Sequence, residues 1–307
     1  MPRMIALAAA LLIVALATLV LSGADRVLQL WALEGQQVAQ NAMARGLRAL
    51  RAGEPAALGG FLAVCFAYGF FHAAGPGHGK LLIGGYGAAR AVGAARLSAV
   101  ALASSLAQGA TAVALVALGL WVWQLGREQM TAMADRLFAP LSFGAIALVG
   151  LWLVWRGLRG LWAARRVGAD LHHDARAHHH HDHGDDCATC GHVHTPDPAA
   201  LAQATGWRDI AVLVGAVAIR PCTGALFVLI LTAQMGIFAV GIMGTLAMAL
   251  GTASVTIAVA IAAVTLRRGV LAGFAGSGVL ARAQPILEIA VGALVAVLAS
   301  QLALAAL

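Results

Sequence analysis

The feature that most constrains this chain is a series of long apolar runs separated by short charged segments. A membrane-spanning helix needs about 20 predominantly apolar residues in succession, and seven runs have about that length or more. The chain is 61% hydrophobic and only 11% charged, whereas about a quarter of a typical soluble domain is charged. The sequence therefore predicts an all-α polytopic membrane protein. The predicted spans are 4–22, 56–75, 96–123, 139–163, 209–234, 237–266 and 286–307.

The positive charges predict an orientation, because cytoplasmic segments of membrane proteins carry an excess of Lys and Arg. With the amino terminus inside, thirteen of these charges fall in inner segments and six in outer segments, while Arg220 lies within a span. The net charge of +7 is spread between apolar runs and is not joined to an aromatic patch. Nucleic acid is therefore not an expected partner, and the lipid bilayer is.

The first two segments each leave two interpretations open. Residues 1–24 contain Arg3, an apolar stretch and small residues at 22–24, which fits either a retained transmembrane anchor or a signal peptide. Residues 25–55 form a predicted periplasmic amphipathic connector, in which Leu28 and Trp31 alternate with Arg, Gln and Glu. This connector is either an interfacial helix on the outer membrane surface or a packed extramembrane helix.

A weak internal repeat relates residues 56–163 to residues 209–307. Each unit begins with a span broken by proline, and the next span carries a polar patch, at 108–111 and at 250–254. Because each unit has three spans, an odd number, the two units must face opposite ways. Inverted units of this kind occur in secondary transporters, whose substrate sites lie at paired broken helices. The predicted helix breaks are at Gly75, Pro76 and Gly77, and at Pro221.

Two histidines flank the first break, and imidazole nitrogens and thiolates suit borderline metals such as nickel, cobalt and zinc. Cys65 and His72 are seven residues apart, so they share one helical face, although packing is an alternative role for Cys65. The second unit supplies a thiol directly after its proline, together with hydroxyl groups. The predicted metal pathway consists of Cys65, His72, His78, Cys222, Thr223 and Thr252.

The charges around this pathway do not favour a cation. No Asp or Glu occurs in the predicted spans 56–75, 96–123 or 237–266, and Asp209, the first residue of the predicted span 209–234, is the only acidic residue of that span. Arg220 and Lys80, by contrast, lie near the breaks. A divalent ion beside fixed positive charges is costly. Glu288, at the start of the last span, is a candidate partner for Arg220.

Nine of the eleven histidines lie within residues 164–208, a segment predicted to be a largely disordered cytoplasmic loop. Its composition is typical of divalent transition-metal binding, and its Cys-x-x-Cys with a nearby His-x-His fits a tetrahedral site that also suits zinc. The predicted loop ligands are His172, His173, His178, His179, His180, His181, His183, Cys187, Cys190, His192 and His194.

The segment Phe66–Lys80 resembles the signature of the nickel/cobalt transporter (NicO) family in its efflux branch, and Ile219–Leu226 resembles the second signature of that family. The resemblance covers nearly the whole chain. It implies a multi-pass protein of the bacterial inner membrane that exports nickel or cobalt. Related uptake permeases carry an acidic residue between their two motif histidines, and here 73–77 contain none, which favours efflux.

We therefore expect a secondary transporter and not an enzyme, with Ni²⁺ or Co²⁺ as substrate and no permanently bound cofactor. The glycine-rich segment ending at Lys80 is not a Walker phosphate loop, since Ala74 stands where a glycine is required and Leu81 where Ser or Thr is required. Two alternatives stay open: a metal-uptake permease subunit, and a transmembrane thiol relay through Cys65 and Cys222. Homo-oligomer formation is also left open.

Overall fold

A computed structural model describes residues 24–75, 78–90, 92–173, 207–272 and 280–305, and these residues form helices and short connections without any strand. The prediction of an all-α protein is confirmed. The elements in chain order are α2 (Ala24–Arg51), α3 (Ala57–Ala74), α4 (His78–Ala89), α5 (Ala94–Trp121), α6 (Arg127–Met133), the π-helix η1 (Ala134–Phe138), α7 (Ala139–His173), α9 (Trp207–Ala218), α10 (Thr223–Gln234), α11 (Phe238–Ala272) and α12 (Leu280–Ala305).

Five segments of the described chain are long and apolar enough to cross a membrane. Helices α9 and α10 form a sixth candidate span, because they pass the same test together while meeting at a bend of 64°. These six correspond to the last six predicted spans, and the chain is a multi-pass membrane protein. The predicted span 4–22 lies outside the described residues. The five unbent candidate spans are Ala57–Ala74, Ala94–Trp121, Arg127–Trp162, Phe238–Gly269 and Gln284–Leu304.

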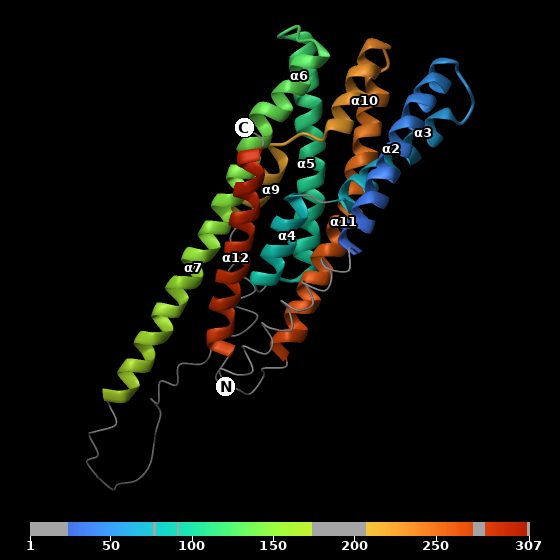
Figure 1. The fold of residues 1–307 in the computed structure, drawn as a ribbon. Coiled ribbons are helices and arrows are strands. Elements are labelled where there is room, and N and C mark those ends of the chain that lie inside the picture. The colour runs from blue at the N-terminus through green and yellow to red at the C-terminus, as the bar shows by residue number, and fades with distance from the viewer. Residues whose placement is uncertain (1–23, 76–77, 91, 174–206, 273–279, 306–307) are drawn as a thin grey trace, which may run out of the picture.

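The two three-span units run in opposite directions and interlock (Figure 1). In the first unit, α3 descends from the end of the bundle that carries α6, and α4 continues downward; in the second, α9 leads upward into α10. Helices α3 and α4 pack on α11 of the other unit, α9 and α10 pack on α5, and α7 packs along α12. Each broken helix is therefore held by the middle helix of the opposite unit.

Glycines bring the helix backbones of the two units together. A Cβ atom at Gly69 of α3 would collide with the carbonyl oxygen of Met248, and one at Gly251 of α11 would collide with that of Phe66. Between α7 and α12, a Cβ atom at Gly292 would lie 2.7 Å from the carbonyl oxygen of Gly150. Since lipid gives no hydrophobic drive for helix association, such close packing of small residues holds membrane bundles together.

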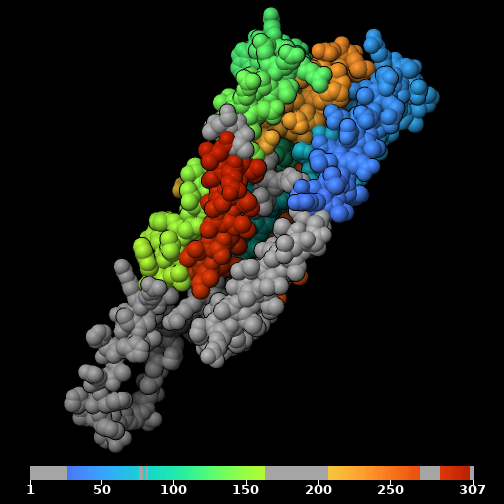
Figure 2. Space-filling model, in the orientation of Figure 1, coloured from blue at the N-terminus to red at the C-terminus, as the bar shows by residue number. Residues whose placement is uncertain are grey.

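Helix α2 packs lengthwise against α3. Its stripe of Ala39, Met43 and Leu47 is buried, whereas Val27 and Leu30 on its other faces are exposed. Figure 2 shows α2 and α12 at the surface of the same face of the bundle. Of the two interpretations of this connector, packing against another helix agrees with the structure, while its position relative to the membrane surface stays a prediction.

The structure differs from the predicted elements at two places. Residues 76–95 fall between two predicted spans, yet residues 78–89 form α4, whose Leu82, Ile83 and Tyr86 are buried in the core. Twelve residues are too few to cross a bilayer alone, and α4 packs mainly on α11 and α12. Helix α7 also continues to His173, past the predicted loop boundary at 164.

Two buried charged residues of the described chain, Arg90 and Glu288, each have an oppositely charged neighbour. The Glu288 carboxylate is buried, lies 3.6 Å from Nε of Arg156 and accepts a hydrogen bond of 3.3 Å from Gln284. Arg90 at the end of α4 lies 4.0 Å from Asp209 at the start of α9. The hypothesis that Glu288 pairs with Arg220 is therefore wrong. Glu288 lies beside α7, where its charged partner is Arg156.

Candidate functional site

Both predicted helix breaks exist and leave helix ends inside the bundle. Helix α3 ends at Ala74, with Gly75 as its extended cap, and α4 begins at His78. Helix α9 ends at Ala218, and Cys222 caps the start of α10 in an extended conformation. Proline has no N–H group and disfavours helical geometry in the residue before it, which explains why α10 starts just after Pro221.

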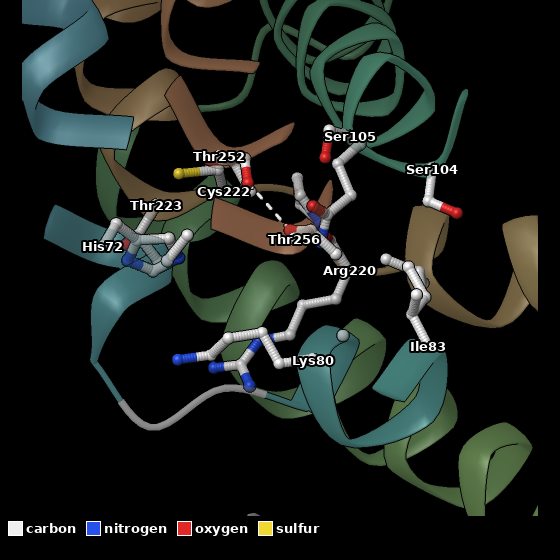
Figure 3. A pocket seen from close by; sticks show the side chains of 15 residues that line it. His72, Lys80, Ile83, Ser104, Ser105, Arg220, Cys222, Thr223, Thr252 and Thr256 are labelled. Atoms are coloured by element: carbon white, nitrogen blue, oxygen red, sulfur yellow. Dashed lines mark hydrogen bonds between the residues drawn. The ribbon is translucent and has the colours of Figure 1, made fainter. Parts of the chain in front are cut away.

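The two breaks meet at one cavity of about 190 Å³ (Figure 3). Its wall comes from both broken helices and from the two middle helices α5 and α11, so each unit contributes two elements. The cavity matches the position that paired broken helices give to substrate sites in inverted-repeat transporters. Its polar lining residues are His72, Lys80, Ser104, Ser105, Gln108, Arg220, Cys222, Thr223, Thr252 and Thr256.

The position of His72 is fixed by its neighbours on α3 and α2. Its imidazole stacks on the Tyr68 ring, with 6.0 Å between ring centroids and 6° between the planes. The Tyr68 hydroxyl accepts a hydrogen bond of 3.3 Å from Nε2 of Gln36 on α2. Helix α2 therefore supports the wall of the cavity without lining it.

Two hydrogen bonds tie the units together at the breaks. Nε2 of Gln108 on α5 donates to the carbonyl oxygen of Arg220, at 3.4 Å. Thr252 Oγ1 on α11 donates to the carbonyl oxygen of Gly69 on α3, at 3.2 Å. The polar patches that suggested the repeat thus have equivalent roles, since each binds the backbone of the opposite unit's broken helix.

Lys80 binds the free end of α3. Its Nζ donates to the carbonyl oxygens of Ala74, at 3.1 Å, and of Gly75. The last carbonyls of a helix lack intrahelical partners and carry a partial negative charge. One of the two positive charges near the cavity therefore has a structural role.

Arg220 places its guanidinium 5.1 Å from the centroid of the Phe143 ring on α7. Neither it nor Lys80 forms a salt bridge with a carboxylate of the described residues. In the same part of the chain, no three His, Cys, Asp or Glu side chains lie close enough together to hold a metal ion. The cavity wall thus offers an imidazole, a thiol, hydroxyls and two fixed cations.

A family model described as a high-affinity nickel-transport protein, NicO, matches residues 58–183 and 170–307, which together make up most of the chain. The chain belongs to the NicO family. The resemblance inferred from the two signature segments is therefore confirmed.

Among curated proteins, this NicO chain is similar to one from Haemophilus influenzae whose name is "Putative nickel/cobalt efflux system". The two are 29% identical over 193 residues, which cover 61% of this chain and 60% of the relative. The chain thus matches less than two thirds of that relative's length. No solved structure matches it.

The predicted pathway residues of the NicO chain fall into three groups. His72, Cys222, Thr223 and Thr252 line the cavity together, as does Pro221. Cys65 does not, because its sulfur packs beside Phe61 and Gly244 in a separate apolar cluster. Cys65 and His72 share one helical face, but seven residues, or two turns of α3, separate them along the helix.

His78 is the first residue of α4, so its backbone lies across the break from His72; its role in the pathway stays a prediction. Pro76 and Gly77 lie outside the described residues, as do the predicted loop ligands from His178 to His194. His172 and His173 are the last two residues of α7.

Three hydroxyl groups of the cavity were missed in the sequence: those of Ser104, Ser105 and Thr256. For two of these hydroxyl groups, the sequence contained a spacing that could have predicted them. Ser104 precedes Gln108 by four residues, and Thr256 follows Thr252 by four, which places each pair on one helical face. A search for polar pairs at this spacing would have found both.

Proposed function

We propose that this chain is a transporter, not an enzyme, that moves divalent nickel or cobalt across the membrane through the cavity between its two helix breaks. The observation that carries the proposal is that His72 and Cys222, from opposite units, line the same cavity. Imidazole and thiolate are suitable ligands for both metals. Membership of a family described as nickel-transport proteins supports the same conclusion.

The incomplete ligand set is compatible with transport. A tight site with four protein ligands holds its ion, whereas a transported ion must leave. His72 and Cys222 would give two strong ligands, with water and the hydroxyls of Thr223 and Thr252 completing the shell. His78 and the His-rich segment would deliver the ion, the latter as a metal-binding store that also accepts zinc.

Export from the cytoplasm is the proposed direction. It is supported by the name of the relative from Haemophilus influenzae and by the absence of an acidic residue between His72 and His78. The principal alternative is a permease subunit that takes metal up. The thiol relay is less well supported, since Cys65 and Cys222 are free thiols and only Cys222 reaches the cavity.

The test is transport of ⁶³Ni²⁺ and Co²⁺ by the purified full-length protein in proteoliposomes, together with metal accumulation in cells that express it. We expect export in cells, loss of transport in His72→Ala, and normal transport in the matched control Cys65→Ala. Wild-type transport by His72→Ala would contradict the assigned site. Greater accumulation in expressing cells would contradict export and support uptake.

A further inference from the structure

The charges of the cavity wall fit an anion better than a bare cation. Lys80 and Arg220 both line the cavity, and no Asp or Glu does. The buried carboxylate Glu288 is engaged with Arg156, and Asp209 lies beside Arg90, two turns from the cavity along α9. The charge of Asp135 on η1 acts on Arg220 from outside the cavity. No carboxylate of the described residues forms a salt bridge with Lys80 or Arg220.

The partial charges of the helix ends at the breaks do not cancel the positive charge of Lys80 and Arg220. Two of them, the ends of α3 and α9, are carboxyl ends, and two, the starts of α4 and α10, are amino ends. Their partial charges of about half a unit each nearly cancel, so the side chains decide the sign. Like charges repel one another strongly at short distance inside a protein, where the effective dielectric constant is lower than in water. A divalent ion entering alone would meet this repulsion from both side chains.

Several groups of the wall are free to bind an anion. Two of the three protons of Lys80 are directed at Ala74 and Gly75, which leaves the third for a ligand. The Arg220 guanidinium has the planar geometry that binds carboxylate or phosphate with two hydrogen bonds. The first turn of α10 starts at the cavity, where the N–H groups of Gly224 and Ala225 face the Cys222 sulfur. The positive end of this helix therefore adds to the field that favours an anion.

Ser104 is an unpaired polar residue of the same wall. It lines the cavity and is only 1% exposed, yet its Oγ has no hydrogen-bond partner among the described residues. Buried polar groups are normally paired. This Oγ is nearly inaccessible where the side chain stands, so it takes no part in the contacts proposed below.

We propose that the cavity binds a small oxyanion, of the carboxylate or phosphate type, through Arg220, Lys80 and the start of α10, and that this anion accompanies the metal ion. The inference rests on the proposed function and deepens it: the transported species is a metal ion neutralised by an oxyanion. The anion supplies the negative charge that the protein does not, and its remaining oxygen atoms can share the metal with His72 and Cys222.

The first experiment measures anion binding without metal. Full-length protein in lipid nanodiscs is dialysed to equilibrium against ¹⁴C-citrate or ³²P-phosphate. We expect saturable binding of at least one of the two, weakened about tenfold or more in Arg220→Gln, as expected for loss of a charge-assisted contact. The matched control is Arg268→Gln, which removes an exposed arginine of α11. Absence of saturable binding of both anions, or equal binding by Arg220→Gln, overturns the proposal.

The second experiment uses the wild-type protein alone, so it does not depend on the folding of a variant. Proteoliposomes receive ⁶³Ni²⁺ with the labelled anion that binds, or with perchlorate, which coordinates metals weakly. We expect both labels to move together and nickel flux to fall in perchlorate. Equal nickel flux in perchlorate overturns the anion proposal and leaves metal transport intact. Anion binding without any metal flux would instead contradict the proposed function.

Discussion

Lys80 reaches back across the first helix break and donates a hydrogen bond of 3.1 Å to the carbonyl oxygen of Ala74, the last residue of α3. A broken helix in a membrane leaves backbone groups unpaired, at several kcal/mol each. Lys80 offsets part of this cost by donating to one of these unpaired carbonyl oxygens, so it stabilises the helix break.

Replacement of Lys80 tests this role. Lys80→Met keeps the length of the side chain but removes the donor, and we expect a loss of about 1–3 kcal/mol of stability. Thermal unfolding of the purified protein in detergent measures the effect. Lys80→Arg keeps a charged donor and should lose less. Equal melting temperatures for Lys80→Met and the wild type would show that the capping contact contributes nothing.

The hydrogen bond from Thr252 to Gly69 predicts a second effect. Thr252→Val keeps the shape of the side chain and leaves the carbonyl oxygen of Gly69 without this donor, at a cost of about 1 kcal/mol. Thr265→Val is the matched control on the same helix, because Thr265 is exposed and bonds only within α11. Melting temperatures of both variants give the comparison, and a larger loss in Thr265→Val would argue against the contact between the units.

The crossing of α3 and α11 should not accept a side chain at Gly251. In Gly251→Ala the new methyl group collides with the backbone of Phe66, and backbone cannot yield as a flexible side chain does. We expect a strong decrease in folded protein, measured by size-exclusion chromatography of detergent extracts. Gly144→Ala on α7, where no atom lies within 4 Å of the added carbon, should fold as well as the wild type. Normal yield of Gly251→Ala would require a looser crossing than the structure shows.

Glu288 is expected to matter for stability and not for metal selection. Glu288→Gln keeps the shape but removes the charge that Arg156 faces at 3.6 Å, and we expect a loss of about 1–3 kcal/mol. The exposed Glu128 provides the control Glu128→Gln. Chemical denaturation measures stability, and the ratio of nickel to cobalt transport should stay unchanged. A shift in that ratio would place Glu288 in the pathway.

Cys222 should influence which metal is preferred. Cys222→Ser replaces a soft ligand by a hard one, so sensitivity of cells to the soft ion Cd²⁺ should change more than sensitivity to Co²⁺. Growth inhibition by each metal is the measurement, and Cys65→Ser is the control, since Cys65 lies outside the cavity. Equal metal profiles for Cys222→Ser and the wild type would exclude the thiol as a ligand.

Much of the fold was accessible from the sequence, because membrane spans have an unambiguous composition. Six predicted spans have counterparts, and Gly75 and Pro221 lie at real breaks. Helix α4 was not predicted, since twelve residues beginning with His78 resemble a loop when no partner is known. The partner of Glu288 was also assigned incorrectly, because sequence separation carries no information on which helix faces it.

By itself, the sequence determined that the chain is a helical membrane protein with two proline-broken spans, and that histidine, cysteine and hydroxyl side chains accompany the breaks. These features are local, since apolar length and the missing N–H of proline act wherever they occur. Tertiary structure decided which of these residues meet. It joined His72 and Cys222 at one cavity, left Cys65 in the apolar core, assigned Lys80 to the end of α3, and left Ser104 unpaired. Only the close packing of the two units, permitted by glycines such as Gly69 and Gly251, brings such distant positions together.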